Sequence, residues 1–174
     1  MRLLLAFLPL ALLTLLVSQL NHICAPSHVY FFVGGLLVVF AALRLDFGVG
    51  FAAVFLAGLF VDAGEPLLRV GAHSFFGVHA FLFATAQVLI FSLRGRLPRE
   101  EMLVSVMFAL LANVGIFLVF SLLYSGRSSN PIGVWPRLLA DLVCSQVLIG
   151  LIAPWFFALQ TRAFSLAGFE LHGR

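Results

Sequence analysis

The chain of 174 residues is 63% hydrophobic and only 10% charged, whereas a soluble domain carries about a quarter charged residues. A soluble protein of this length could not hide so much apolar surface, because a small globule leaves a large fraction of its surface in water. All 10 basic residues are arginines, scattered between apolar runs in the manner of a topology signal, which argues against a nucleic-acid-binding surface. The composition predicts an all-α integral membrane protein in which residues 1–174 form a single transmembrane domain.

Six apolar segments follow one another along the chain, and each approaches the length of a helical membrane crossing. They are Leu3–Ile23, Val29–Leu43, Phe47–Val61, Phe75–Leu93, Met102–Tyr124 and Leu138–Leu159. The sequence therefore predicts a bundle of about six transmembrane helices.

The first segment resembles a signal peptide, because Arg2 precedes an apolar stretch. The stretch nevertheless runs to about 20 residues, the length of a spanning helix, and no small-x-small cleavage site follows it cleanly. We expect a retained first helix, with cleavage as the alternative.

The second and third segments are short, and only the sequence RLDFG divides them. We expect them to form a tight helical hairpin whose helices either barely cross the apolar core or cross it with little tilt. The alternative is that both merge into one long re-entrant element.

Arginines in the short loops predict how the helices are oriented. If the N-terminus is cytoplasmic and the segments alternate, the cytoplasmic side carries Arg2, Arg44, Arg94, Arg96, Arg99, Arg162 and Arg174. The outer side then carries Arg69, Arg127 and Arg137. The excess favours the cytoplasm for both termini, and the cluster around Arg94, Arg96 and Arg99 contributes most of it.

A few polar residues fall near the expected outer ends of the helices, where such groups are costly in lipid. Asp62 ends the third segment, His79 lies near the start of the fourth, and Asp141 lies near the start of the sixth, after Arg137. Together with Glu65 they form a candidate outer patch that would bind a small ligand or a partner protein. The alternative is that these groups pair with one another and with loose backbone groups.

Patterns typical of metal sites and of catalysis are missing from the sequence. No HxH, HxxxH or HExxH spacing occurs, so we expect no metal. There is no GxSxG motif and no glycine-rich phosphate loop. We therefore expect no catalytic residues and no cofactor.

Small residues recur at three- and four-residue spacing along the third segment. They are Gly50, Ala53, Ala57 and Gly58. Small residues on one face let helix backbones approach closely in lipid. The amides Gln87 and Asn113 are expected to form hydrogen bonds between helices.

The stretch from Gly58 to Arg99 resembles the MreD family of bacterial rod-shape-determining membrane proteins. In that family a Gly-Leu-hydrophobic-hydrophobic-Asp sequence ends one helix, and Gly-x-His-Ala or a similar sequence starts the next, which finishes in an arginine-rich cytoplasmic turn. The matching positions are Gly58, Leu59 and Asp62, then Gly77, His79 and Ala80, then Arg94, Arg96 and Arg99. The connection from Asp62 to Gly77 is several residues longer than the family pattern leads us to expect.

The resemblance implies a non-enzymatic scaffold of the cell-elongation machinery in the cytoplasmic (inner) membrane. Its implied partners are MreC-like and MreB-like proteins and the glycosyltransferase–transpeptidase pair that extends side-wall peptidoglycan. The single transmembrane helices of the MreC-like protein and of the transpeptidase would contact the small-residue face of the third helix and the surroundings of Asp62. The implied fold is similar to the S-component of energy-coupling-factor transporters, which raises a second hypothesis. That hypothesis is a carrier that binds a vitamin-like solute in an outward-facing pocket lined by Asp62, His79 and Asp141.

Overall fold

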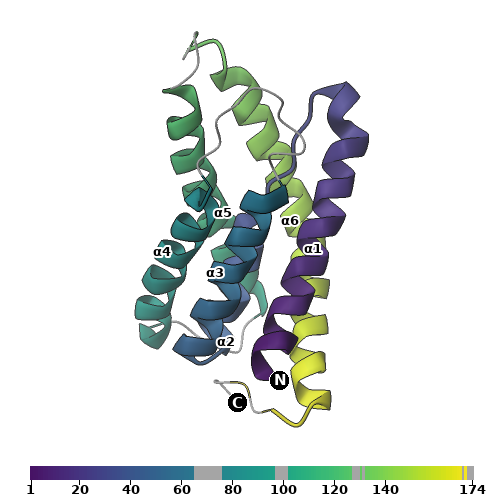
Figure 1. The fold of residues 1–174 in the computed structure, drawn as a ribbon, viewed down its shortest axis with the longest axis vertical. Coiled ribbons are helices and arrows are strands. Elements are labelled where there is room, and N and C mark those ends of the chain that lie inside the picture. The colour runs from purple at the N-terminus through teal and green to yellow at the C-terminus, as the bar shows by residue number, and fades with distance from the viewer. Residues whose placement is uncertain (65–75, 97–101, 127–129, 131, 170, 172–174) are drawn as a thin grey trace.

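A computed structural model describes residues 1–64, 76–96, 102–126, 130, 132–169 and 171 (Figure 1). In order along the chain, the elements are α1 (Arg2–Cys24), the 3-10 turn η1 (Ala25–Ser27), α2 (Gly34–Arg44), α3 (Phe47–Gly64), α4 (Val78–Leu93), the 3-10 turn η3 (Arg94–Arg96), α5 (Met102–Ser125) and α6 (Trp135–Leu166). The described residues contain no strand, so the all-α prediction is confirmed for them.

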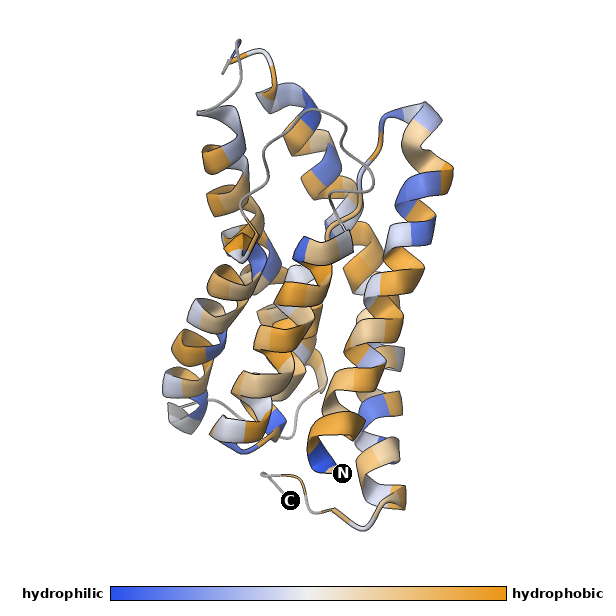
Figure 2. Cartoon of the chain, viewed as in Figure 1, coloured by the Kyte–Doolittle hydropathy of each residue, from blue (hydrophilic) through white to orange (hydrophobic). Residues whose placement is uncertain are grey.

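Four helices of the described chain are long and apolar enough to cross a membrane. They are α1 together with η1, α3, α5 and α6. Apolar residues cover most of the length of these helices (Figure 2). The two remaining helices are shorter, with 11 residues in α2 and 16 in α4. At 1.5 Å per residue, α2 covers only about half of an apolar core that is about 30 Å thick.

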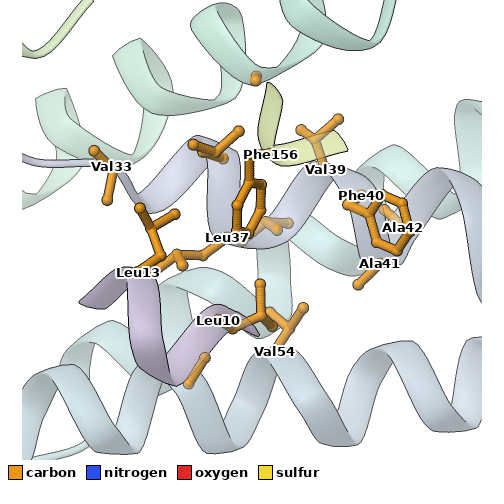
Figure 3. Close-up of a cluster of buried hydrophobic side chains, with 14 of the residues drawn as sticks. Leu10, Leu13, Val33, Leu37, Val39, Phe40, Ala41, Ala42, Val54 and Phe156 are labelled. Carbon is orange, nitrogen blue, oxygen red and sulfur yellow. The ribbon is translucent and has the colours of Figure 1, made fainter. Parts of the chain in front are cut away.

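The short helix α2 forms the centre of the bundle. All its residues from Gly34 to Leu43 are buried, and it contacts α3, α4, α5 and α6. The core around it includes Leu10 and Leu13 from α1, Leu37, Val39 and Phe40 from α2, Val54 from α3 and Phe156 from α6 (Figure 3). A helix that is hydrophobic on all sides suits this buried position.

The second predicted segment, Val29–Leu43, is helical only from Gly34 onwards, because residues 29–33 are non-helical. The chain leaves α1 at one end of the bundle and returns through this non-helical stretch and then through α2. An ion pair of 3.5 Å between Arg2 Nη1 and Asp46 Oδ2 brings the end of α2 beside the start of α1. The expectation of a continuous helix over Val29–Leu43 is therefore wrong, since the first third of this segment is non-helical.

The expected hairpin of the second and third segments is confirmed. Leu45, with φ −101° and ψ 162°, ends α2 in an extended conformation, and α3 begins two residues later and packs against α2. The two segments therefore form separate helices, not one merged element. The helix α3 also continues to Gly64, so that Asp62 lies in its last turn instead of beyond it.

The start of α1 and the end of α6 lie at the same end of the bundle (Figure 1). After α6, Gly168 has φ +72°, and the N–H of Phe169 donates to the carbonyl of Phe164 over 3.1 Å, which closes the helix. The guanidinium of Arg2 lies 4.9 Å from the centre of the Phe169 ring. Arg44 and Arg94 belong to the same region, since Arg94 Nη1 donates to the Leu45 carbonyl over 2.9 Å. We call this region the arginine end; it carries Arg2, Arg44, Arg94 and Arg162.

Candidate functional site

Asp62, in the last turn of α3, binds the first turn of the neighbouring helix α4. Its Oδ2 accepts hydrogen bonds from the N–H groups of Gly77 (3.0 Å) and Ala80 (3.3 Å). Its Oδ1 accepts from the N–H of His79 (3.2 Å) and lies 2.8 Å from Nδ1 of the same residue. A helix leaves its first N–H groups without partners inside the helix, and Asp62 caps α4 from a different helix. Both Asp62 and His79 are buried.

Two glycines allow this junction to form. Gly77 has φ +99°, a left-handed conformation that costs a residue with a side chain 1–2 kcal/mol or so. Gly58 lies one turn before Asp62 on α3, and a Cβ there would lie 2.6 Å from the backbone nitrogen of Ala80. Helices α3 and α4 therefore meet backbone to backbone beside the capped turn.

Aromatic rings surround the imidazole of His79. The centres of Phe32 and Phe83 lie 5.9 Å from that of the imidazole, and the centre of Phe120 lies 4.9 Å from it. These rings come from the non-helical stretch, α4 and α5. No group of three or more potential metal ligands occurs within the described part of the chain. The chemistry around His79 is thus that of a buried, carboxylate-paired ring in an apolar shell.

Asp141, on α6, holds a different segment. Its Oδ1 accepts from the N–H of Tyr30 over 2.9 Å. Ser145 lies one turn further along α6, where its hydroxyl accepts from the N–H of Phe32 (2.9 Å) and donates to the Asp141 carbonyl (2.6 Å). One face of α6 therefore supplies hydrogen-bond acceptors to the non-helical stretch before α2.

Two amide side chains complete this set of backbone contacts. Asn21 of α1 binds both backbone groups of Phe31. Its Oδ1 accepts a hydrogen bond from the Phe31 N–H over 2.7 Å, and its Nδ2 donates to the Phe31 carbonyl over 2.9 Å. Asn113 of α5 accepts from the N–H of Gly35 over 3.1 Å. Non-helical backbone at membrane depth is tolerated only where its polar groups are satisfied within the protein. Side chains from α1 and α6 satisfy three consecutive N–H groups of this stretch, from Tyr30 to Phe32, and the carbonyl of Phe31.

The candidate outer patch divides between these two clusters. The structure brings Asp62 and His79 together, whereas the carboxylate of Asp141 contacts the backbone of the non-helical stretch. Arg137 is exposed one turn before Asp141, and Glu65 lies outside the described residues. Sequence reasoning named the acidic residues but missed Asn21 and Ser145, which look like ordinary polar residues in apolar helices.

The small-residue face of α3 lies inside the bundle. Its members, all of them buried, are Gly50, Ala53, Ala57 and Gly58. A Cβ on Gly50 would lie 2.8 Å from Nε2 of Gln87 and 2.9 Å from the carbonyl oxygen of Ala41. The expectation that these residues allow close helix packing agrees with this geometry. The expectation that the same face binds a partner is wrong, because α2 and α4 already cover it.

Two further expectations meet different outcomes. Asn113 forms a hydrogen bond with another helix, as expected, but the buried amide of Gln87 has no hydrogen-bond partner among the described residues. Of the three arginines expected to mark topology, Arg94 also has a structural contact, since its guanidinium lies 3.9 Å from the centre of the Phe91 ring. Arg96 belongs to η3, and Arg99 lies outside the described residues.

A cavity of about 230 Å³ lies between α1, the end of α3 and the non-helical stretch. Its lining is mainly apolar and includes Val17, Asn21, Tyr30, Phe31 and Phe60. Asp62, His79 and Asp141 are not among its lining residues. A solute in this cavity would therefore contact aromatic and aliphatic groups, and not the three residues from which the sequence predicted a pocket.

The side chains of both clusters have the same role. Each forms hydrogen bonds with backbone groups that would have no partner in lipid. One cluster fixes the start of α4, and the other fixes the stretch that leads into α2.

Comparison of the chain with models of protein families, with curated proteins and with solved structures finds no match.

Proposed function

We propose that the protein is a non-enzymatic scaffold subunit of the bacterial cell-elongation machinery, as its resemblance to the MreD family implies. It lies in the cytoplasmic membrane with both termini in the cytoplasm. It contacts MreC-like and MreB-like proteins and the glycosyltransferase–transpeptidase pair of side-wall peptidoglycan synthesis. One observation carries this proposal: the buried carboxylates of Asp62 and Asp141 accept hydrogen bonds from the protein's own backbone. A carboxylate used in this way supports the fold and leaves less capacity for a reaction or a solute.

The geometry of the matching positions supports a structural role for the motif. Gly58, Asp62, Gly77, His79 and Ala80 all meet at the junction of α3 and α4. Each has a role that depends on its size, its backbone angle or its hydrogen bonds. A motif of this kind specifies how two helices join, which is what a scaffold needs from its sequence.

The orientation has support from the distribution of arginines. The described arginines gather at the arginine end, with Arg137 at the start of α6 as the exception. Short loops rich in arginine stay in the cytoplasm, so we assign the arginine end to that side.

Because the small-residue face of α3 is covered, partner helices would contact the outward-facing residues of α1, α5 and α6.

Depletion of the protein in a rod-shaped host tests the proposal. A scaffold of elongation is needed for the cylindrical wall, so depleted cells should widen and become round within a few generations. Restoring the wild-type gene should restore the width. Depleted cells that keep a constant width at an unchanged growth rate would contradict the proposal.

A second candidate function is an S-component-like carrier of a small vitamin-like solute. The cavity of about 230 Å³ beside the non-helical stretch favours it, because binding sites in transporters are often built beside interrupted helices and are mostly apolar. The depletion strain separates the two functions. A scaffold predicts wider cells with normal uptake of labelled vitamins, whereas a carrier predicts reduced uptake at normal width.

A further inference from the structure

A second cavity, of about 430 Å³, opens at the arginine end between α2, α5 and α6. Two arginines line it, Arg44 at the end of α2 and Arg162 near the end of α6. The hydroxyl-bearing residues Ser105 and Ser165 line it as well. None of these four residues belongs to the clusters of Asp62 and Asp141, so the cavity is separate from the site described above.

Neither arginine forms an ion pair with another described residue. The ion pairs of the described chain are Arg2 with Asp46 and His79 with Asp62; neither includes Arg44 or Arg162. Two arginines that line one cavity favour an anionic ligand, and the planar guanidinium group suits phosphate oxygens in particular.

Most of the remaining lining residues are apolar. Phe40 and Phe157 form a buried part of the wall and stack on each other with ring centres 6.3 Å apart, whereas Met102 is exposed. A free phosphate would bind the arginines and leave Met102 uncovered. A ligand with a phosphate beside a glycerol and acyl chains would cover both parts. Basic pockets between helices near the cytoplasmic face are known to hold lipid headgroups.

We propose that this cavity binds the headgroup of one anionic glycerophospholipid from the adjacent leaflet. Arg44 and Arg162 bind the phosphate, and the hydroxyls of Ser105 and Ser165 donate to its remaining oxygens. Met102 contacts the glycerol and the upper acyl chains, and Phe40 and Phe157 form the buried apolar wall of the cavity. Ser105 lies in the first turn of α5, where the positive end of the helix dipole also favours a negative charge.

Thermal unfolding of the purified full-length protein in a neutral detergent tests this proposal. Dioctanoyl phosphatidylglycerol should raise the Tm by several degrees in a saturable manner. Dioctanoyl phosphatidylcholine of the same chain length, and inorganic phosphate, should raise it much less. Arg162→Gln and Arg44→Gln should each weaken the apparent affinity about tenfold or more, since a hydrogen bond to a charged group contributes 1.5–3 kcal/mol or so.

Arg137→Gln is the matched control, because Arg137 is an exposed arginine on the same helix as Arg162 but at its other end. This variant should bind phosphatidylglycerol as the wild type does. If it weakens binding as much as Arg162→Gln, the effect comes from general surface charge and the proposal is wrong.

Two results with the wild-type protein would also overturn the proposal, and neither requires a variant to fold. Equal Tm shifts with both lipids would show that the headgroup is not recognised. A saturable shift of the same size with inorganic phosphate alone would assign the cavity to a free phosphate compound. If the glutamine variants fail to fold, Arg44→Lys and Arg162→Lys keep the positive charge but lack the bidentate guanidinium group. These variants should still lower the affinity for phosphatidylglycerol.

Discussion

Asp62 joins two helices through hydrogen bonds that no other side chain supplies in the described structure. Replacing it with alanine leaves the N–H groups of Gly77, His79 and Ala80 without their acceptor. A buried donor without a partner costs about 1–3 kcal/mol, so we expect Asp62→Ala to lower the free energy of unfolding by about 2–4 kcal/mol. Unfolding in a titration from mild detergent to dodecyl sulfate measures this change.

Asp46→Ala is the control for this substitution. Asp46 pairs with Arg2 over 3.5 Å at a site where both side chains are about half exposed. Such a pair contributes about 1 kcal/mol or less, so Asp46→Ala should lower the free energy of unfolding much less than Asp62→Ala does. Equal losses in the two variants would refute the capping role of Asp62.

Gly58 tests the close contact between α3 and α4. Gly58→Ala places a Cβ 2.6 Å from the nitrogen of Ala80 and 2.9 Å from the carbonyl carbon of His79, which forces the two helices apart. We expect a loss of about 1–3 kcal/mol in the same unfolding titration. Gly48→Ala, on the same helix but with nothing within 4 Å of the new Cβ, should be neutral or slightly stabilising. A neutral result for Gly58→Ala would contradict the backbone-to-backbone packing.

At the scale of residues, the sequence predicted which polar groups are unusual but not what they bind. Rules for helix caps consider residues next to the helix start, whereas the cap of α4 comes from α3, 15 residues before Gly77 along the chain. Asp141 and Tyr30 are 111 residues apart. Partners at such separations depend on the tertiary fold, which local patterns do not contain.

The traverse formed by residues 29–33 and α2 is the element that departs most from the prediction. Hydropathy counts apolar residues and cannot distinguish an extended apolar stretch from a helical one. The sequence VYFFVGG carried a usable signal, because β-branched and aromatic residues favour extended backbone and two glycines follow them. Gly35 lies so close to α5 that a Cβ would be 2.8 Å from the Cα of Asn113, which explains why the helix starts with small residues.

The hydrogen bonds from α6 should determine how well this stretch is ordered. Ser145→Ala removes the acceptor of the Phe32 N–H, so amide exchange in a peptide spanning residues 28–35 should accelerate by about tenfold or more. Hydrogen–deuterium exchange with mass spectrometry measures it. Cys144→Ala, at the adjacent half-buried position on α6, should leave the exchange unchanged. Rapid exchange of this peptide in the wild type would contradict the structure of the stretch.

For the whole molecule, the number and order of apolar segments were predictable, but their arrangement was not. Lipid chains are as apolar as a protein core, so hydropathy does not separate lipid-facing helices from buried ones. Thus α2 is buried from Gly34 to Leu43, whereas Leu8 of α1 and Leu151 of α6 are 68% and 67% exposed, although all three segments are similarly apolar in sequence. The central place of α2 follows from its length and its packing, which only the fold reveals.

The orientation of the whole bundle can be measured by labelling single cysteines. In a background with Cys24→Ser and Cys144→Ala, we expect Ile132→Cys to react with a membrane-impermeant maleimide in intact cells. Gly95→Cys should react only after the cells are permeabilised, because it lies in η3 at the arginine end. Both positions are exposed, so access to the reagent depends on the side of the membrane. The reverse pattern would contradict a cytoplasmic arginine end.

The central claim is that the buried polar side chains act through the fold alone, and a paired measurement of cell width and Tm tests it most directly. A depleted rod-shaped host would receive Asp62→Asn, Asp141→Asn or Ser145→Ala, and the amount of folded protein in the membrane and its Tm would be determined for each variant. We predict that cell width recovers in proportion to the folded protein, and that a weakly folding variant recovers at lower growth temperature. A variant with wild-type Tm and wild-type abundance that fails to restore cell width would contradict the account.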